Sequence, residues 1–426
     1  MFRGIIIAGI MSVVMVFLPS AGRCLDVSNS EIMEELKALK ARIDVLEEKL
    51  KEKDHEIERL KDEQVVHTAP ESELDEKELK DGILDKISDL VSIGGLIEVG
   101  AAYQGIKNRD GTDEDDSDID LTTVEIGVEV KVNEWVNAQT VFLYEDPFGN
   151  NPEDESDVTL DVGTVTIGNC DEFPFSLTAG KMYVPFGAIL THLPDDPLVE
   201  QPMTLLFGET SEKAVLLGYQ QNGFNVSGYV FNGDMDEYGS DNTIGDFGFD
   251  ITYTAPEGNI LELLTGVSYM SDIAESDGLS DYITSDDHPI GPLEYIDDPV
   301  DGFAAYLHLG INEIFFDAEY MTALSEFDPT EIALGGDNGA RPSVLNIETG
   351  YNWNWGKNLE IVLKYEGSHE TGALGYPHRR YGIGFNQEIM DSLTGSVAYF
   401  RDRFHSDDAQ GRDDRDILCS QISVEF

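Results

Sequence analysis

The sequence predicts an all-β protein, a sixteen-stranded antiparallel transmembrane β-barrel with an N-terminal coiled-coil helix. Alternation of apolar and polar side chains begins at Val91 and recurs sixteen times before the chain reaches Phe426. The connections between these segments alternate between short turns and long loops rich in Asp, Gly and Pro. Short turns on one rim and long loops on the other are typical of a barrel that crosses an outer membrane.

The composition excludes several classes of protein. The chain has 426 residues, with 84 acidic and 27 basic side chains and a formal net charge of -57. Because nucleic acid attracts the opposite charge, we expect no nucleic-acid partner. Hydrophobic residues make up 41% and aromatic residues 9%, too many for a disordered chain. The three cysteines, Cys24, Cys170 and Cys419, have no spacing that indicates a disulfide framework or a metal site.

Residues 1–22 have the pattern of a signal peptide. Arg3 precedes an apolar run from Gly4 to Leu18, and small residues follow it. The run is short for a membrane-spanning helix. Cys24 offers the alternative of a lipid-modified amino terminus, but Arg23 before it is not the small residue that such processing requires. We therefore expect an exported chain.

Residues 27–63 are predicted to form a periplasmic coiled coil. Apolar residues recur at alternating steps of four and three, interrupted at Lys53; they are Ile32, Leu36, Leu39, Ile43, Leu46, Leu50, Ile57 and Leu60. Such a seam needs partner helices, and the alternative is a helix folded onto its own chain. By analogy with other pores of this size, we expect a homotrimer. Residues 64–90 read as an acidic linker, with a short helix in the barrel mouth as the alternative.

Residues 91–426 are predicted to form the barrel. The clearest strand runs from Thr122 to Val132, where valines and an isoleucine alternate with Thr123, Glu125 and Glu129. The predicted strands are 92–105, 120–132, 135–145, 157–168, 174–184, 212–221, 223–232, 246–255, 259–271, 302–312, 314–325, 343–354, 357–367, 378–388, 391–403 and 414–426.

The two kinds of connection differ in length. Asn222-Gly223 and Asn312-Glu313 are short turns, whereas residues 107–118 and 272–301 are read as long loops. Closure of the last strand onto the first removes an edge that would otherwise aggregate. The last strand carries an alternating apolar face that ends at Phe426, which resembles the signal read by the barrel-assembly machinery.

The third long connection is unusually apolar. It follows the break at Pro185 and Gly187 and contains five leucines, Met203 and Phe207. A loop of this length and composition must pack against other parts of the chain. We expect it to fold into the barrel and narrow the channel. Its predicted constriction residues are Asp195, Asp196, Glu200 and Glu209.

Strand parity directs a set of charged side chains into the lumen. The predicted pore-lining residues are Glu98, Glu125, Glu129, Lys131, Asp250, Glu262, Asp317, Glu319, Glu348, Glu360, Lys364, Glu366 and Glu425. Rings of carboxylates concentrate cations and repel anions. For any one of them alone, the alternative is a solvated side chain.

Four arginines, Arg379, Arg380, Arg401 and Arg403, cluster at the outer rim. Two interpretations are open. They form a basic strip opposite the acidic third loop, or they bind lipopolysaccharide phosphates from outside. The second is suggested by the parity of Arg401 and Arg403, which places them on the side that faces lipid.

The sequence offers no catalytic or metal-binding motif. The acidic segment 110–120 does not match the helix-loop-helix calcium pattern, so a solvated loop is favoured over Ca²⁺ binding. His192 and His308 stand alone and give no metal-ligand set. No nucleophile has a recognisable base. We expect neither enzymatic activity nor a cofactor.

Two strings carry a family resemblance. Gly94-Gly95 with Glu98 opens the first strand, and residues 180–187 read GKMYVPFG before the third loop. With these strings the chain resembles the legiobactin-type siderophore porin family. The resemblance implies uptake of a siderophore-metal complex across the outer membrane of a Gram-negative bacterium. About 65 residues precede the first strand after the signal peptide, too few for a large plug domain, so transport should be passive. The alternatives are a general cation-preferring porin and a structural barrel that tethers the outer membrane to the cell wall.

Overall fold

The computed structural model describes residues 90–146, 158–193, 201–233, 235–237, 244–256, 261–286, 288–293, 295–335, 338–353, 358–406 and 408–426. The predicted signal peptide, the predicted coiled coil and all of the predicted linker except Leu90 lie outside these residues.

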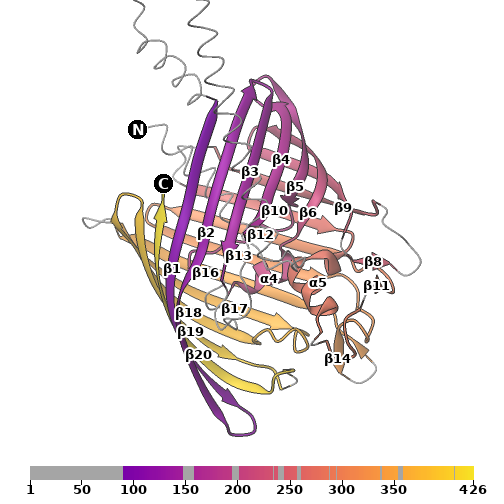
Figure 1. Ribbon diagram of the computed structural model, residues 1–426, viewed down its shortest axis with the longest axis vertical. Helices are drawn as coiled ribbons and strands as arrows, with labels where there is room; N and C mark the ends of the chain where they lie inside the picture. The colour runs from indigo at the N-terminus through magenta and orange to yellow at the C-terminus, as the bar shows by residue number, and fades with distance from the viewer. Residues whose placement is uncertain are drawn as a thin grey trace, which may run out of the picture. The chain divides into compact units, whose positions relative to one another are not determined.

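Within the described residues, sixteen strands form one closed antiparallel barrel in which each strand pairs with its neighbours in chain order (Figure 1). The barrel strands are β1 (Val91–Asn108), β2 (Asp113–Asn133), β3 (Val136–Glu145), β4 (Thr159–Asn169), β5 (Phe173–Tyr183), β6 (Ser211–Gln221), β7 (Phe224–Phe231), β9 (Asp246–Thr254), β10 (Leu261–Met270), β12 (Gly302–Ile311), β13 (Ile314–Ala323), β16 (Ser343–Trp353), β17 (Leu359–His369), β18 (Arg379–Met390), β19 (Leu393–Arg403) and β20 (Arg412–Glu425). The predicted strand number is therefore confirmed.

The long connections carry short elements of their own. These are α4 (Met203–Gly208), β8 (Asp236–Glu237), η1 (Ile273–Glu275), α5 (Asp277–Thr284), β11 (Tyr295–Ile296), β14 (Ala333–Gly335) and β15 (Asn338–Gly339). β8 pairs with β11 and β14 pairs with β15, in two small sheets separate from the barrel. Helices α4 and α5 pack against each other (Figure 1).

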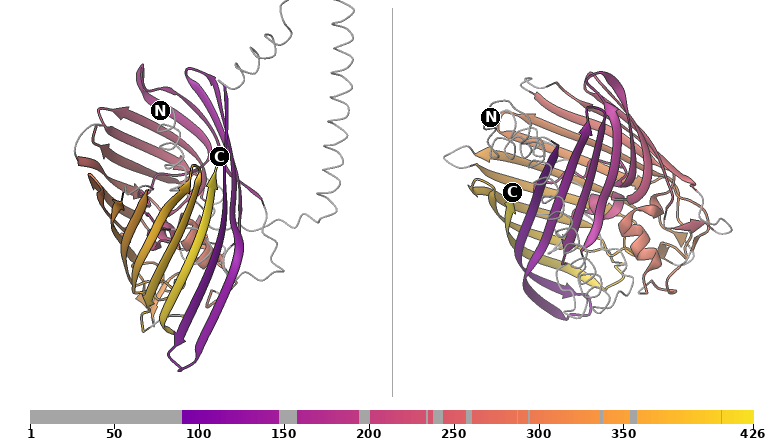
Figure 2. Two further views of the ribbon diagram at one scale, coloured as in Figure 1. Left: turned by 90° about the vertical axis from the view of Figure 1, so that its left-hand side faces the viewer. Right: turned by 45° about the horizontal axis from the view of Figure 1, so that its top comes forward.

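The barrel closes between β1 and β20. The backbone amide of Gly95 donates to the carbonyl oxygen of Phe426 at 3.0 Å, and the amide of Phe426 donates back to Gly95 at 3.1 Å. The left view of Figure 2 shows β1 in indigo beside β20 in yellow. Because both strands are paired on both sides, the predicted closure is confirmed and no open edge remains at this seam.

The outer face of the barrel is apolar. Large side chains such as Ile93, Val165, Leu217, Leu363 and Leu418 are exposed there. Aromatic rings pair along this face near both rims: Phe175 with Tyr219 and Phe224 with Tyr253 near the short turns, and Phe249 with Tyr269 and Tyr365 with Tyr381 near the long loops. An apolar wall between two aromatic bands matches the two interfaces of a bilayer. Separately, none of the helices in the described part of the chain has the length and apolar character needed to cross a membrane.

The first connection differs from the prediction. Residues 107–118 were expected to form a long loop, but β1 continues to Asn108 and β2 begins at Asp113, so most of the segment lies in a long hairpin. Lys107 pairs with Asp113 and Gly105 with Asp115 across it. A strand's hydrogen bonds join backbone groups, so a charged sequence extends the ladder beyond the membrane, where both faces meet water. Composition alone misled the prediction.

The hydrophobic core lies inside the barrel, on the side of the long loops. Met203, Leu205 and Phe207 of α4 join Ile273, Leu279 and Ile283 of the connection 271–301, and Phe327 and Ile332 of the connection 324–342. They pack on inward side chains of the strands, among them Met321 and Val344. This packing explains why the third connection is so apolar, because its side chains are removed from water inside the barrel.

Candidate functional site

The third long connection, residues 184–210, is called loop three below, and its described residues lie inside the barrel. It leaves β5 at Val184, whose amide donates to the carbonyl oxygen of Thr210 at 3.0 Å, so the loop closes at its base. Its described residues, 184–193 and 201–210, form hydrogen bonds with inward side chains of β13, β16, β17 and β18. These four strands are called the anchoring wall below.

Glu319 of β13 holds the first bend of loop three. Its carboxylate accepts hydrogen bonds from the backbone amides of Ala188 at 2.6 Å, Ile189 at 3.0 Å and Leu190 at 3.3 Å. To aim these amides at one carboxylate, Gly187 and Ile189 adopt positive φ angles of 80° and 48°. Positive φ strains a β-branched residue such as Ile189. The three amide bonds to a buried charge offset that strain.

Glu348 and two asparagines hold the next residues. The carboxylate of Glu348 accepts from the hydroxyl of Thr191 at 2.9 Å and from the amide of His192 at 2.7 Å. Asn346 donates to the carbonyl oxygen of Leu190 at 2.7 Å, and Asn386 donates to that of His192. The backbone of loop three is thereby paired along the wall, as buried polar groups require.

The returning half of loop three is held by a second group of charges. Glu366 accepts from the amide of Met203 at 2.7 Å. Lys364 lies 3.2 Å from Glu348 and 3.5 Å from Glu366, so one ammonium serves both buried carboxylates. Arg380 contacts Glu366 at 3.2 Å and donates to the carbonyl oxygen of Gln201 at 3.3 Å. Buried charges persist only when they are paired in this way.

The structure corrects the prediction that His192 and His308 stand alone. Nε2 of His192 lies 2.9 Å from Oδ2 of Asp317, and Nδ1 of His308 lies 2.5 Å from Oδ1 of the same carboxylate. Nδ1 of His192 is 3.1 Å from Glu360. Burial alone lowers the pKa of His192, but hydrogen bonds to Asp317 and Glu360 and the charges of Glu360 and Glu348 raise it to about 10. The imidazole is therefore protonated at neutral pH.

The predicted pore-lining residues fall into two groups. Glu98, Glu125, Asp250, Asp317, Glu319, Glu348, Lys364 and Glu366 are buried, and Glu360 is partly buried. Glu129, Lys131, Glu262 and Glu425 are exposed and lie toward the short turns. Asp250 is held by hydroxyl groups of Thr252, Ser268 and Tyr306. Much of the inner charge thus anchors the structure instead of facing open water.

Three of the predicted constriction residues, Asp195, Asp196 and Glu200, lie outside the described residues. The fourth, Glu209, follows α4 and is buried. Its neighbourhood includes Asp277 of α5, whose backbone amide donates to the carbonyl oxygen of Glu209 at 2.8 Å. Glu209 therefore lies where loop three meets the connection 271–301.

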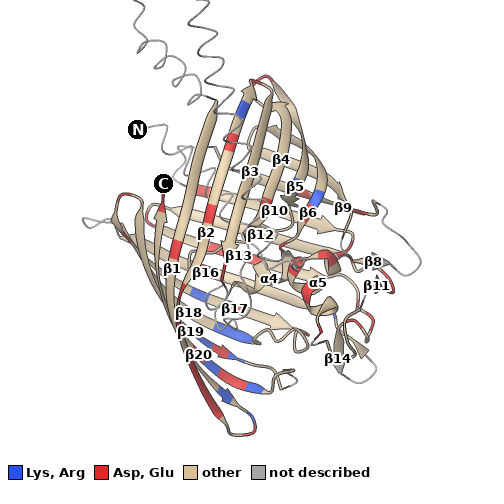
Figure 3. Cartoon of the chain, viewed as in Figure 1, with Lys and Arg blue, Asp and Glu red and all other residues tan. Residues whose placement is uncertain are grey.

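The four arginines divide between the two faces of the sheet. Figure 3 shows basic segments in blue and acidic segments in red along the strands labelled β18, β19 and β20. Arg380 points inward and is buried beside Asp402, which also pairs with Arg415 at 2.7 Å. Arg401 and Arg403 lie on the outer face and pair with Asp414 and Asp416 of β20. Arg379 is exposed at the start of β18. Arg380 is thus the arginine of this set that contacts loop three.

A cluster of three carboxylates lies near the long-loop rim, where Asp246 begins β9 and where Asp272 and Glu275 belong to the connection 271–301. Oxygens of Asp246, Asp272 and Glu275 lie within 4.8 Å of one another. Burial raises the pKa of Asp272 to about 7, and burial together with the charge of Asp272 raises the pKa of Glu275 to about 9. Glu275 therefore carries a proton at neutral pH. Sequence reasoning did not single out this group.

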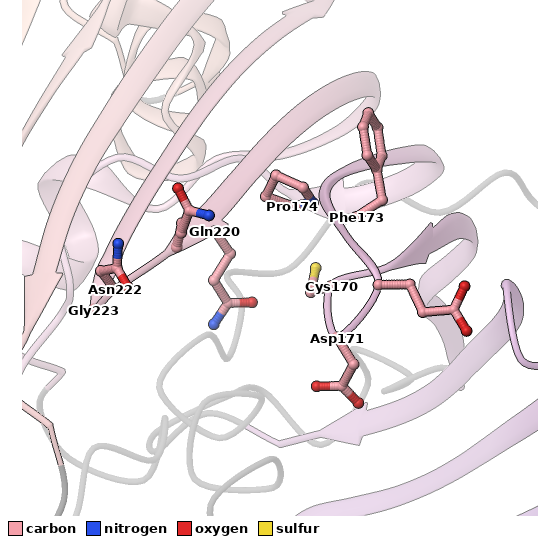
Figure 4. Close-up of a pocket in the computed structure, with 9 residues that line it drawn as sticks. Cys170, Asp171, Phe173, Pro174, Gln220, Asn222 and Gly223 are labelled. Atoms are coloured by element: carbon pink, nitrogen blue, oxygen red, sulfur yellow. The ribbon is translucent and has the colours of Figure 1, made fainter.

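A pocket of about 400 Å³ lies at the opposite, short-turn rim (Figure 4). Cys170 and Asp171 reach it from the turn between β4 and β5, and Asn222 and Gly223 reach it from the turn between β6 and β7. The start of β5 adds Phe173 and Pro174, and the end of β6 adds Gln220. It is a feature of two surface turns and does not touch loop three.

Some anchoring residues were not predicted. Asn346 shares the inward parity of Glu348 on β16, Asn386 lies opposite Glu360 of β17, and Asp402 lies opposite Arg380 of β18; this parity could have indicated them. The partners of Asn346 and Asn386 in loop three could not have been named, because the contacts join residues far apart in the chain.

No family model matches the chain. It is 28% identical over 312 residues to a UPF0422 protein of Coxiella burnetii, covering 72% of this chain and 62% of that protein. It is 27% identical over 326 residues to a UPF0422 protein of Legionella pneumophila, covering 74% of this chain and 59% of that protein. The matches thus span less than two thirds of the length of these relatives.

Solved structures share the fold at low sequence identity. The outer membrane channel DcaP of Acinetobacter baumannii has a TM-score of 0.52 and 13% identity, covering 79% of this chain and 97% of that one. An anion-selective porin from Comamonas acidovorans has a TM-score of 0.52 and 10% identity, covering 79% and 99%. OprB of Pseudomonas putida has a TM-score of 0.51 and 9% identity, covering 82% and 97%. The chain therefore has the fold of an outer-membrane porin.

Proposed function

We propose that this protein is an outer-membrane channel for passive diffusion of small solutes in a Gram-negative bacterium. The observation that carries the proposal is the closed barrel with an apolar outside, in which the described residues of loop three are held against the inner wall by Glu319, Glu348 and Glu366. A barrel packed only for stability has no need to hold a polar backbone segment by buried charges. A loop held in this way sets the size and charge of a passage.

The orientation follows from the turns. Short turns of such barrels face the periplasm, so the rim with the connections 271–301 and 324–342 faces outward. Outer-membrane lipid then contacts the apolar wall, and lipopolysaccharide is the expected neighbour of the exposed outer-face residues Arg379 and Arg403.

The proposed cargo is a siderophore-type metal chelate. The strings Gly94-Gly95 and 180–187, which carry the family resemblance, support this choice. The second of them leads directly into loop three, and Gly187 forms its first bend. The string therefore marks the element that restricts the passage.

A second candidate cargo is small cations. From Val91 to Phe426 the chain has 63 acidic and 14 basic residues, and this excess favours cations over anions in the passage. The homotrimer and the tether to the cell wall remain proposals that rest on residues 27–63, which lie outside the described residues.

The test is a conductance measurement in planar bilayers. Removal of residues 190–206 deletes Leu190, His192 and Met203, which bond to the anchoring wall, and we expect single-channel conductance to rise severalfold. Unchanged conductance would contradict the proposal. Block of the parent channel by a ferric siderophore supports the chelate cargo, whereas cation selectivity without block supports the second candidate.

A further inference from the structure

Three side chains from three separate elements meet on the inner side of the barrel. His192 comes from loop three, His308 from β12 and Asp317 from β13. One ligand atom from each, an imidazole nitrogen or a carboxylate oxygen, lies within 4.8 Å of the other two. The group joins loop three to β12 and β13.

The donor atoms suit a divalent transition metal. Two imidazole nitrogens and one carboxylate oxygen are ligands that Zn²⁺, Ni²⁺ and Cu²⁺ accept in proteins. A nitrogen or oxygen ligand lies about 2.0–2.2 Å from such an ion. When the ligand–metal–ligand angle is a right angle or somewhat wider, the two ligand atoms are therefore about 2.9–3.5 Å apart. Nε2 of His192 and Oδ2 of Asp317 are 2.9 Å apart. The group needs only a small expansion to enclose an ion.

The His192 ring is already oriented for this role. Its other nitrogen, Nδ1, lies 3.1 Å from Glu360, and Asn386 donates to Glu360 at 2.9 Å. A carboxylate on the second imidazole nitrogen is the usual outer partner of a metal-bound histidine. The ring also stacks on Phe315, with centroids 3.7 Å apart and planes at 15°. Its position therefore does not depend on an ion.

The solvent accessibility of the three side chains is also suited to binding a metal ion. The side chain of Asp317 is 1% exposed, while those of His192 and His308 are 27% and 25% exposed. Oδ2 of Asp317 is buried, and Nε2 of His192 lies 2.9 Å from it. An ion can thus approach from the side of the imidazoles, reach a buried oxygen, and keep positions for water.

We propose that His192, His308 and Asp317 bind a divalent transition-metal ion, with Glu360 as the outer partner of His192, and that the ion fastens loop three to β12 and β13. Coordination uses the nitrogen lone pairs, so binding displaces the protons that these nitrogens share with Asp317. The bound ion links loop three to β12 and β13, which hydrogen bonds join when no ion is bound. The proposal rests on the proposed function only in its effect on permeation; metal binding itself does not require transport.

The experiment measures Zn²⁺ binding to the full-length, untagged protein in detergent after chelator treatment. Cys170→Ser serves as the background, because Cys170 is a free, exposed thiol that could bind Zn²⁺. We expect one saturable site per chain by calorimetry and a rise in melting temperature on Zn²⁺ addition. His192→Asn with His308→Gln should weaken binding at least tenfold. His369→Gln, a change at an exposed histidine beside Glu370, is the matched control and should bind as the parent does.

Glu360→Gln provides a second variant that leaves the three ligands in place, and it should weaken Zn²⁺ binding about 10-fold to 100-fold. Co²⁺ gives an independent readout, because its visible spectrum should change on binding to the parent and not to the double variant. Absence of saturable Zn²⁺ binding, or equal affinity in the parent and the double variant, would overturn the proposal. A protein that binds Zn²⁺ but forms no channel would contradict the proposed function alone.

Discussion

At the residue scale, backbone geometry and buried charge are linked in the first bend of loop three. Gly187 and Ile189 adopt positive φ angles so that three amides converge on Glu319. Burial of the Glu319 carboxylate without hydrogen bonds would be costly, and the three amides supply those bonds. The positive φ angles strain the backbone, and the bonds to Glu319 offset that strain. Neither feature is explained without the other.

Gly187→Ala should destabilise the protein more than Gly111→Ala. Both glycines have positive φ, so each change costs about 1–2 kcal/mol of backbone strain. At Gly187 the new Cβ would also lie 2.2 Å from Cε of Met321 and 2.7 Å from Oε1 of Glu319, whereas nothing lies within 4 Å at Gly111. Crowding adds about 1–3 kcal/mol at Gly187. Thermal unfolding in detergent measures the stability of both variants. Equal melting temperatures would contradict the close contacts of Gly187 with Met321 and Glu319.

Glu275 gives a prediction for pH. Its pKa is raised from 4.5 to about 9 by burial and by the charge of Asp272, so the folded state holds a proton that the unfolded state releases above pH 4.5. Stability contributed by the protonated group is therefore lost as the pH rises from 4.5 toward 9. Glu275→Gln should raise the melting temperature at pH 9 and leave it unchanged at pH 4. Glu326→Gln, at an exposed site in the connection 324–342, should show no such difference.

At the scale of elements, loop three and the anchoring wall form one unit. Inward carboxylates of β13, β16 and β17 each accept backbone amides of the loop, and Lys364 and Arg380 balance two of them. The loop is thus held by charge on its polar side and by the apolar core around α4 on its other side. Removal of the Lys364 ammonium should therefore loosen both the outgoing and the returning half of loop three, because Lys364 pairs with Glu348 and with Glu366.

Lys364→Met should lower stability by about 3–5 kcal/mol, because it leaves Glu348 and Glu366 buried without their shared ammonium. We also expect larger and noisier single-channel currents as loop three loosens. Lys131→Met removes the same charge from an exposed site on β2 and serves as the control. If the two variants melt alike, the shared ion pair does not hold the loop.

At the scale of the whole molecule, the barrel separates an apolar outside from a charged inside, and the acidic excess dominates its field. Some of that excess is neutralised by buried partners, such as Asp402 between Arg380 and Arg415. The exposed inner carboxylates, Glu129 and Glu262 among them, remain in contact with water. The field in the passage should therefore respond to salt.

The ratio of K⁺ to Cl⁻ permeability should exceed one in dilute salt and fall toward one in concentrated salt. The screening length is about 30 Å at 0.01 M and about 3 Å at 1 M, so fixed charges act across the passage only in dilute solution. Reversal potentials measure the ratio. Glu129→Gln with Glu262→Gln should reduce it, whereas Asp416→Asn on the outer face should not. A ratio that is independent of salt would mean that size, and not charge, selects the solute.

The sequence by itself determined the number of strands, the face that each presents and the closure at Phe426. Alternation and turn residues are local, so each strand can be recognised from its own neighbours. The tertiary structure alone decided which partners meet: Glu319 with the bend at Ile189, and His192 with His308 and Asp317. These contacts join segments that are distant in the chain, so no local pattern identifies them. Parity places a carboxylate inside, but the loop that packs on it decides whether it faces water or a buried amide.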